Sequence, residues 1–249
     1  MTGKNRRLSR LLVGPQQRCL LSPLDHGGWL GPVQGIHRPR AIVEAVIAGG
    51  ANALLFSPGF YRRVAPIVPP STGIVLRVSL TAGLSEQGTQ ETPIASLETA
   101  LRMDADALAV SVFFGRSGDI EIYRWLASLI DSAARYEMPV VAEMMPPGDR
   151  FYDADAIAHA ARIGMEIGAD IIKTNYCGDV EAFRDITASA PVPIIVAGGP
   201  GKGNDSDTID LVRDVVAAGA AGVAIGRRVW QAEDPQAVTA EIHKVLFAD

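Results

Sequence analysis

The sequence predicts one α/β domain folded as a (β/α)8 barrel, the TIM-barrel architecture, and three observations support this prediction. The chain has 249 residues, a length typical of a single barrel of this kind. Short apolar runs alternate with amphipathic stretches along the chain, as expected for buried parallel strands and the helices that cover them. A phrase in which a small residue and an alanine precede an apolar run occurs four times, as GGANALLF, MDADALAV, IGADIIKT and AGAAGVAIG.

We expect eight strands, and helices between them. The expected strands span residues 19–24, 52–57, 74–80, 107–113, 139–144, 170–175, 193–197 and 222–225. Apolar residues at i, i+3 and i+4 spacing predict helices that include residues 38–48, 120–136, 154–167 and 207–218. The first of these helices ends in a Gly-Gly pair, which is a stop signal. No Pro-, Ser- or Gly-rich linker divides the chain, so we expect one domain over residues 1–249, with residues 1–17 as a leader before the first strand.

The composition excludes several classes of protein. Apolar residues make up 48% and charged residues 20% of the chain, which is typical of a soluble globular protein. The formal net charge is −5, and we interpret the one basic cluster (Lys4, Arg6, Arg7 and Arg10) as part of a solvated leader, so we expect no nucleic-acid partner. Two cysteines without ligand spacing and histidines scattered at 26, 37, 159 and 243 predict neither a disulfide framework nor a metal site. No apolar run reaches the length of a signal peptide or a membrane span, so we expect no membrane association and a cytoplasmic location.

Polar residues recur where the expected strands end. In barrels of this class the chemistry takes place at the carboxyl ends of the strands, where the βα loops begin. The positions that meet this rule are Asp25, His26, Ser57, Arg77, Ser79, Ser111, Glu143, Lys173, Asn175, Gly198, Gly199, Gly226 and Arg227.

Lys173 is an unusual residue for a barrel strand. It lies in the segment ADIIKTNY, and neither the helix-covered outside nor the packed inside of a barrel accommodates an ammonium group well. Burial disfavours the charged form of a lysine, and a neutral lysine is a nucleophile that can attack a carbonyl group and form an imine. An imine then acts as an electron sink when a neighbouring C–C bond breaks. The alternative is a lysine that pairs with a carboxylate in the barrel mouth and serves packing alone.

The last two strands end in patterns that predict a phosphate site. The seventh ends in IIVAGGPGKGN and the eighth in VAIGRRVWQ, and loops at these two positions form the common phosphate site of the fold. The glycines Gly198, Gly199 and Gly226 allow backbone N–H groups to approach an anion, and Arg227 adds a charge-assisted contact. Lys202 is a further candidate, whereas we expect Arg228 to face solvent. The alternative is that the glycines serve only tight turns.

Four of these motifs, taken in order, resemble those of the archaeal-type class I aldolases. They are SPLDHG after the first strand, ADIIKTNY on the sixth, IVAGGP on the seventh and GRRVWQ on the eighth, and the resemblance spans nearly the whole chain. The family includes class I fructose-bisphosphate aldolases, 2-amino-3,7-dideoxy-heptulosonate synthases and the thiolase that processes the phosphorylated autoinducer-2 breakdown product. The four motifs are specific for the family and not for a substrate.

The resemblance implies a function and a set of roles. Lys173 would be the Schiff-base lysine, and Asp25 would lie near the lysine and the hydroxyl or carbonyl group of the substrate, where a carboxylate can relay protons. His26 either takes part in proton transfer or orients its loop. The substrate would be a phosphorylated keto compound, with no cofactor or metal, and the family's ring assemblies imply a homo-oligomer.

One departure from the family pattern concerns the proton-transfer acid/base. The family usually has a tyrosine on the fifth strand in a phrase like YPRG, whereas this chain reads MPPG with Met145 at that position. Period-2 alternation puts Glu143 on the same face of the strand, and a partly buried Glu143 with a raised pKa is a candidate for the missing acid/base. The alternative is an ion pair of Glu143 with Lys173 or Arg77. Tyr152 is a weaker substitute.

Arg77 is the second unusual strand charge. With Ser79 it is a candidate to bind a carboxylate or a second phosphate of the substrate, and an internal ion pair with Glu143 is the alternative. For the whole chain, the leading hypothesis is a Schiff-base aldolase that cleaves or condenses a phosphorylated keto substrate such as dihydroxyacetone phosphate or a ketose phosphate. Thiolase-type acyl transfer, an imine-free sugar-phosphate isomerase or epimerase, and a non-catalytic descendant of the aldolases are the alternatives.

Overall fold

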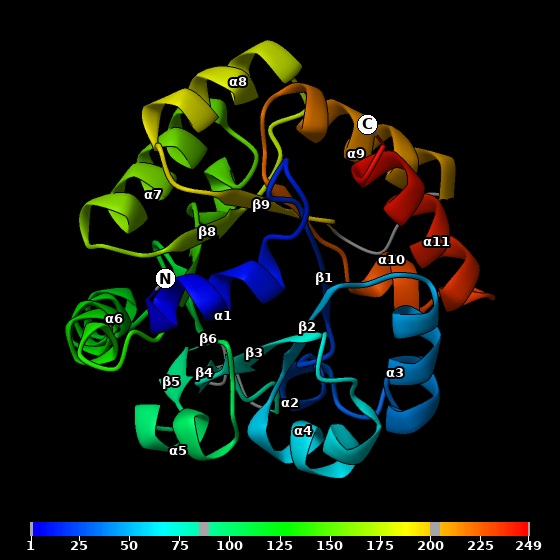
Figure 1. Cartoon of the computed structure of the whole chain (residues 1–249). Coiled ribbons are helices and arrows are strands. Elements are labelled where there is room, and N and C mark those ends of the chain that lie inside the picture. Colours follow the sequence, from blue (N-terminus) through cyan, green and yellow to red (C-terminus); the bar gives the residue numbers. More distant parts are fainter. Residues whose placement is uncertain (1, 85–89, 200–204, 249) are drawn as a thin grey trace.

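A closed barrel of eight parallel strands forms the centre of the molecule (Figure 1). The structure is a computed structural model that describes residues 2–84, 90–199 and 205–248. In order around the barrel the strands are β1 (Cys19–Pro23), β2 (Ala53–Phe56), β3 (Gly73–Arg77), β6 (Ala107–Phe113), β7 (Val140–Met145), β8 (Ile171–Thr174), β9 (Ile194–Ala197) and β10 (Gly222–Ala224). The last strand pairs with β1 and closes the ring. The predicted (β/α)8 architecture is therefore confirmed.

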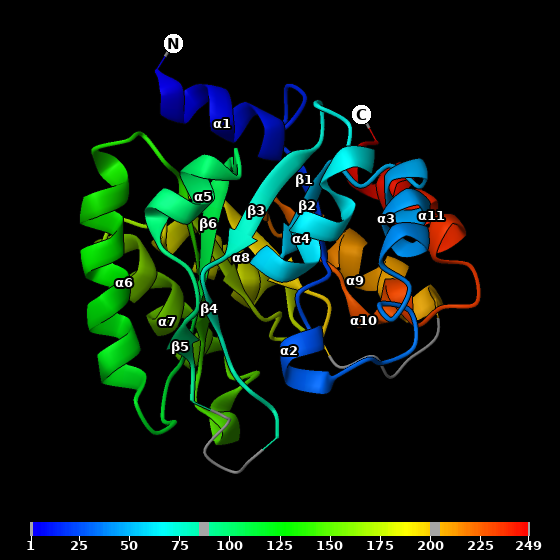
Figure 2. The same cartoon turned by 90° about the horizontal axis from the view of Figure 1, so that it is seen from below.

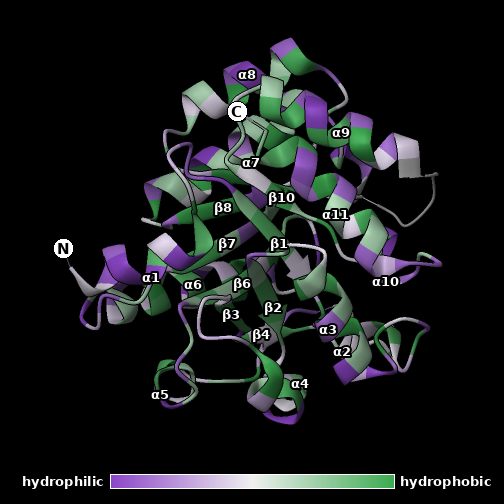
Figure 3. Ribbon diagram, turned by 45° about the vertical axis from the view of Figure 1, so that its right-hand side comes forward, coloured by the Kyte–Doolittle hydropathy of each residue, from purple (hydrophilic) through white to green (hydrophobic). Residues whose placement is uncertain are grey.

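The helices form a ring outside the barrel (Figure 1). They are α3 (Pro39–Ala48), α4 (Pro58–Val64), α5 (Leu97–Arg102), α6 (Asp119–Ala134), α7 (Ala154–Glu166), α8 (Val180–Ser189), α9 (Asp205–Ala217) and α11 (Pro235–Leu246). Aspartate side chains cap the starts of α7, α8 and α11, where each accepts a backbone N–H of the first turn, which satisfies donors that a helix start leaves open. Figure 3 shows mostly apolar strands and helices that carry polar residues as well. No helix within the described ranges is long and apolar enough to cross a membrane.

Two apolar clusters stabilise this arrangement. The larger one lies between the strands and the surrounding helices and includes Phe56, Leu126 and Trp230. The smaller one fills the inside of the barrel with alternate strand residues such as Leu21 and Val75. Successive residues of a strand point to opposite faces, so each barrel strand contributes to both clusters and reads as a continuous apolar run.

The leader differs from the prediction of a solvated segment. Residues 3–11 form α1 (Gly3–Leu11), which lies across the end of the barrel where the strands begin (Figure 2). Its Leu11 packs into the inner cluster, and the Nζ of Lys4 lies 2.8 Å from Asp170. Arg10 pairs with the buried Asp106, also at 2.8 Å. The basic cluster therefore holds a helix over the barrel floor.

The third predicted strand, residues 74–80, is also corrected. The barrel part ends at Arg77, and the next residues form β4 (Ser79–Leu80), which leaves the barrel and pairs antiparallel with β5 (Thr92–Pro93). Two single-turn helices, α2 (Gly27–Leu30) and α10 (Arg227–Trp230), follow β1 and β10, and the 3-10 segments are η1 (Ala65–Ile67) and η3 (Gly148–Arg150). Figure 2 shows α2 at the end of the barrel opposite α1, so α2 lies at the mouth where the strands end.

Candidate active site

A cavity of about 340 Å³ opens at the carboxyl ends of the strands. Nearly every strand of the barrel contributes to its wall directly or through the loop that follows. The polar lining residues are Asp25, His26, Arg77, Thr81, Glu91, Ser111, Arg116, Glu143, Tyr152, Lys173, Asn175 and Arg227. Among the residues that the structure describes, no group of three or more His, Cys, Asp or Glu side chains is placed to hold a metal ion.

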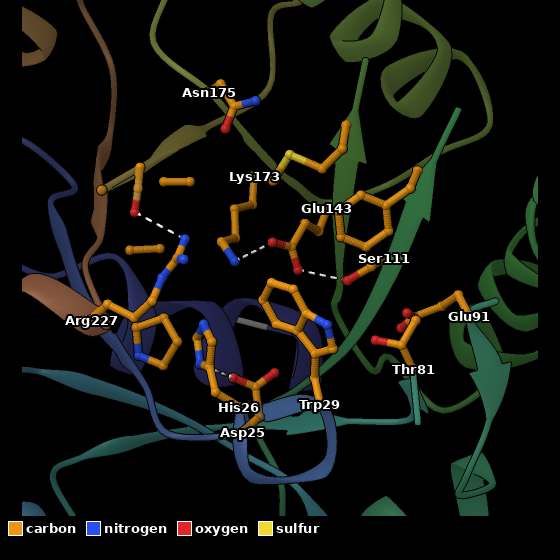
Figure 4. Close-up of a pocket in the computed structure, with 18 of the residues that line it drawn as sticks. Asp25, His26, Trp29, Thr81, Glu91, Ser111, Glu143, Lys173, Asn175 and Arg227 are labelled. Atoms are coloured by element: carbon orange, nitrogen blue, oxygen red, sulfur yellow. Dashed lines mark hydrogen bonds and ion pairs between the residues drawn. The ribbon is translucent and has the colours of Figure 1, made fainter. Parts of the chain in front are cut away.

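Lys173 and Glu143 form an ion pair in this cavity. They are direct neighbours in the register of β8 and β7, and the Nζ of Lys173 donates to Oε1 of Glu143 (Figure 4). The two side chains are only 7% and 9% exposed. The ion pair named as an alternative for Glu143 is therefore present. Lys173 is buried, and it lines the cavity.

Arg77 lies at the centre of a second set of contacts. Its Nε donates to Oδ2 of Asp25 at 2.6 Å, its Nη2 to Oε2 of Glu143 at 2.7 Å, and its Nη1 to the hydroxyl of Ser111 at 2.5 Å. The Ser111 hydroxyl also donates to Oε2 of Glu143 at 2.7 Å. Arg77, Asp25, Glu143 and Lys173 thus form one cluster of two cations and two carboxylates, which we call the charge cluster. Because the guanidinium of Arg77 is engaged on three sides, the internal ion pair is the arrangement that the structure contains.

The charge cluster corrects the expected raised pKa of Glu143. Burial acts to raise the pKa of this carboxyl group, but the cations of Lys173 and Arg77 outweigh burial and lower it to about 2. Burial also acts on Asp25, yet Arg77, with smaller contributions from His26 and Lys173, holds the pKa of Asp25 well below its usual range. Both carboxyl groups are therefore ionised at neutral pH, and neither is a proton donor in the resting protein.

His26 lies between Asp25 and the glycines that follow the last strands. Its Nδ1 is 3.4 Å from Oδ1 of Asp25, and its ring packs against Trp230 with centroids 5.6 Å apart. A Cβ at Gly226 would come within 3.3 Å of the His26 ring, so the imidazole is next to the expected phosphate site. The structure thus brings Asp25 and His26 into the same cavity as Lys173.

The predicted phosphate residues gather at the opposite end of the cavity from β3 and β6. Gly198, Gly199, Gly226 and Arg227 all line it, and the Nη2 of Arg227 donates to the carbonyl of Gly199 at 3.2 Å. Gly199 has φ +71°, a backbone conformation that glycine adopts readily. Lys202 lies outside the described residues.

Arg228 differs from the expected solvent-facing position. It is half-buried, and its Nη1 donates to Thr208 on α9 at 3.2 Å. Its guanidinium therefore joins α10 to the first turn of α9.

Ser79, Met145 and Tyr152 were also singled out in the sequence, and the structure places each of them in or next to the cavity. Ser79 is fully buried, and its hydroxyl donates to Glu91 at 2.5 Å and accepts the N–H of Ser111 at 3.2 Å. Met145 is 3% exposed and lines the cavity together with Glu143, as alternation along the strand predicts. Tyr152 lines the same cavity, and its hydroxyl is 3.9 Å from a Cβ built on Gly199, which places it near one of the residues expected to bind phosphate.

Sequence reasoning missed the wall on the β3 and β6 side. Glu91, Thr81 and Arg116 line the cavity there, and Arg116 lies 4.0 Å over the ring of Phe113. Glu91 directly precedes the short strand β5, which pairs with β4. No periodic pattern marks a two-residue strand, so the one available signal was a charged residue next to Thr92–Pro93 after a polar loop.

Comparison with known proteins identifies the family. The sequence model of the DeoC/LacD family of aldolases matches residues 19–232. A 2-amino-3,7-dideoxy-D-threo-hept-6-ulosonate synthase from Halobacterium salinarum is 35% identical over 99% of this chain and 92% of its own length. A 2-amino-4,5-dihydroxy-6-oxo-7-(phosphonooxy)heptanoate synthase from Streptomyces griseus is 32% identical over 96% of this chain and 89% of its own length.

The barrel also resembles solved structures. An archaeal fructose-1,6-bisphosphate aldolase, described with its catalytic lysine covalently bound to the carbinolamine intermediate of the substrate, superposes with a TM-score of 0.86. The alignment covers 98% of this chain and 100% of that one, at 23% identity, and it supports the fold. Taken with the family match and the two relatives, it leads to one conclusion: the chain belongs to the DeoC/LacD family of aldolases.

Proposed function

We propose that this protein is a class I aldolase in which Lys173 forms a Schiff base with a phosphorylated keto substrate. The observation that carries the proposal is the position of Lys173, a buried lysine whose amino group faces a cavity that also contains Gly198, Gly199, Gly226 and Arg227. Two of the relatives named above are synthases of seven-carbon chains, and the archaeal aldolase of the same fold acts through a lysine.

The phosphate end fixes the orientation of the substrate. Backbone N–H groups near Gly198, Gly199 and Gly226 and the guanidinium of Arg227 would bind the phosphate, and His26 lies beside them. The carbonyl carbon, which in dihydroxyacetone phosphate is separated from the phosphate ester oxygen by one CH2 group, would then meet Nζ of Lys173 on β8, the strand next to β9. Holding the two reacting groups together in this way lowers the entropic cost of the attack.

The charge cluster suits imine formation. Glu143 is the nearest acceptor for a proton of the Lys173 ammonium, and the neutral amine then adds to the carbonyl carbon to give a carbinolamine. Glu143 returns the proton to the carbinolamine hydroxyl, which leaves as water and gives the iminium, so that Glu143 is again a carboxylate. The iminium carries the same charge as the ammonium that it replaces, so Glu143 and Asp25 face a cation before and after. Asp25, fixed by Arg77 at 2.6 Å, would accept a hydrogen bond from the substrate hydroxyl next to the imine carbon.

Both relatives are named synthases, which suggests that this protein forms a C–C bond and does not break one. One product name contains an amino group at one end and a phosphonooxy group at the other. By analogy, this protein would join a three-carbon phosphate donor to an aldehyde. Arg116, exposed at the cavity rim on the side away from Arg227, would bind an anionic end of the aldehyde acceptor.

Borohydride trapping tests the Schiff base. The protein is incubated with dihydroxyacetone phosphate and, separately, with fructose 1,6-bisphosphate, then reduced, and the masses of the intact chain and of its peptides are recorded. We expect one stable adduct on Lys173 that is absent in Lys173→Ala and present in Lys244→Ala, which alters an exposed lysine of α11. Failure of both compounds and of a wider set of ketones to label a folded protein would refute the aldolase proposal. That result would favour the imine-free isomerase instead.

A further inference from the structure

The step that follows imine formation needs a proton-transfer group that the charge cluster does not provide. When a C–C bond forms, the aldehyde oxygen must receive a proton, and when the bond breaks, a hydroxyl group must lose one. Met145 carries no exchangeable proton. Glu143 and Asp25 are ionised and are fixed by Arg77 and Lys173, so the proton must come from another group in the cavity wall.

Among the described residues that line the cavity, Glu91 is the carboxyl group outside the charge cluster. It lines the cavity and is half-buried. Its Oε1 accepts the hydroxyl of Ser79 at 2.5 Å, and Ser79 is itself fixed because it is fully buried and accepts the N–H of Ser111 at 3.2 Å. One oxygen of Glu91 is thus held in place by a buried side chain, as a positioned acid/base requires.

The strand order places Glu91 where an extended substrate would end. In the ring of eight strands, β3 and β6 lie opposite β9 and β10. The phosphate residues follow β9 and β10, whereas Glu91 contacts Ser79, which directly continues β3. In Figure 4, Arg227 and Glu91 lie on opposite sides of Lys173 and Glu143. A substrate bound by its phosphate and joined to Lys173 therefore directs its remaining carbons toward Glu91.

We propose that Glu91 is the catalytic acid/base for the C–C bond step, in place of the tyrosine that this chain lacks. The proposal rests on the Schiff base at Lys173. In condensation, the enamine carbon attacks the aldehyde carbon, the electron pair of the carbonyl moves to oxygen, and the Glu91 carboxylic acid gives its proton to that oxygen to form a hydroxyl group. In cleavage, the Glu91 carboxylate takes the hydroxyl proton, the carbonyl re-forms, and the electrons of the C–C bond return to the iminium to give the enamine.

The surroundings of Glu91 favour a group that changes protonation. Burial raises its pKa, and Glu143 and Asp25 raise it further, while Arg77 and the Ser79 hydroxyl act in the opposite direction with a smaller total effect. Among the described residues, Arg116 also interacts with it. Glu91 and Glu143 therefore have pKa values shifted in opposite directions, which is how one site provides both a permanent carboxylate and an acid/base.

The test measures imine formation and the C–C bond step separately. Four proteins are compared: the wild type, Glu91→Gln, Glu91→Asp and Glu44→Gln. The last is the control, because Glu44 is an exposed residue of α3. Imine formation is measured by borohydride trapping of dihydroxyacetone phosphate. The C–C step is measured by mass spectrometry as cleavage of fructose 1,6-bisphosphate and as condensation of dihydroxyacetone phosphate with glycolaldehyde, glyceraldehyde 3-phosphate or aspartate semialdehyde.

We expect Glu91→Gln to trap the donor within about twofold of the wild type and to lose at least about 100-fold in the C–C step, the effect of removing a general acid/base. Glu91→Asp should recover part of that loss, and Glu44→Gln should behave as the wild type. In the wild type, condensation should slow as pH rises through the pKa of Glu91, because the acid form is needed, and cleavage should accelerate over the same range. Glu91→Gln should lack this limb of the pH profile.

Three results would overturn the assignment of Glu91. They are a C–C rate in Glu91→Gln within about threefold of the wild type, an equal loss of trapping and C–C activity, and a wild type that traps the donor but neither cleaves nor condenses any of the compounds. A wild type that traps no donor at all would instead refute the Schiff base itself.

Discussion

Replacing Arg77 with methionine should destabilise the fold strongly. The side chain is 5% exposed and contacts Asp25, Glu143 and Ser111. Its removal leaves two buried carboxylates without the cation that they share. Breaking a buried ion pair from one side costs about 3–5 kcal/mol, and about 1 kcal/mol shifts the Tm of a chain of this size by roughly 2–4 °C. We therefore expect the Tm at pH 7 to fall by about 6–20 °C.

The pH dependence of that loss identifies its cause. In the wild type, the pKa values of Asp25 and Glu143 are lowered on folding, so their contribution to stability is present above the unfolded pKa of about 4. It is lost as the pH falls toward the folded value, which is about 2 for Glu143. In Arg77→Met, burial is no longer countered by the guanidinium, so these carboxyl groups take up protons at a higher pH. The difference in Tm between the two proteins should therefore shrink between pH 7 and pH 4.

Differential scanning calorimetry across this pH range measures both effects. Arg135→Met is the control, because Arg135 and its partner Asp131 are 74% and 75% exposed and an exposed pair contributes little to stability. Arg77→Lys, which keeps the charge but cannot reach three partners at once, should give an intermediate Tm. A fall of less than about 3 °C in Arg77→Met, or a fall that is the same at pH 7 and pH 4, would refute the electrostatic account of the charge cluster.

Three further substitutions test the phosphate end, the barrel closure and the leader. Arg227→Met should raise the KM for dihydroxyacetone phosphate by roughly 10-fold or more, the value of one charge-assisted contact, and leave the KM for unphosphorylated dihydroxyacetone unchanged in steady-state assays. Gly222→Ala puts a Cβ 2.0 Å from the carbonyl of Cys19 and should yield insoluble protein, whereas Gly27→Ala meets nothing within 4 Å and should be soluble. Arg10→Met removes a half-exposed partner of the buried Asp106, which costs about 1–3 kcal/mol and should lower the Tm by about 2–12 °C, and an unchanged Tm would mean that the pair of Arg10 and Asp106 adds nothing to stability.

The barrel could be predicted from the sequence because parallel strands buried on both faces leave a strong signal. Each expected strand overlaps a barrel strand, and the rule that chemistry lies at strand ends located Lys173, Glu143 and Asp25 in one cavity. What the sequence could not show is which charges pair. Arg77 was a candidate substrate ligand, and only the geometry shows that Asp25, Glu143 and Ser111 occupy its donors.

The leader helix and the end of the third strand also differ from the sequence prediction, and both differences come from contacts between residues that are distant in the sequence or in a loop. The basic leader looks solvated in the sequence because Lys4 and Arg10 find their partners, Asp170 and Asp106, far along the chain. The expected third strand ran too far because Val78 and Leu80 continue its apolar pattern, yet Ser79 and Leu80 pair with a two-residue strand that no periodicity reveals. Glu91 was missed for that reason, since its place in the cavity depends on this pairing.

The charges inside the cavity explain how one site can keep a lysine buried and still use it. With Lys173 protonated, the charge cluster contains two cations and two anions, so the carboxylates replace much of the solvation that the buried ammonium loses. The same balance holds after the ammonium becomes an iminium, which means that the carboxylates stabilise the intermediate without moving. During imine formation Glu143 only passes a proton from Lys173 to the leaving water, which restores the balance, whereas a cluster carboxylate that held the proton of the C–C step would leave the cluster with one anion fewer. Proton transfer at the C–C bond is therefore better served by a carboxyl group outside it, and Glu91, bound to Ser79 and facing the same cavity, meets that requirement.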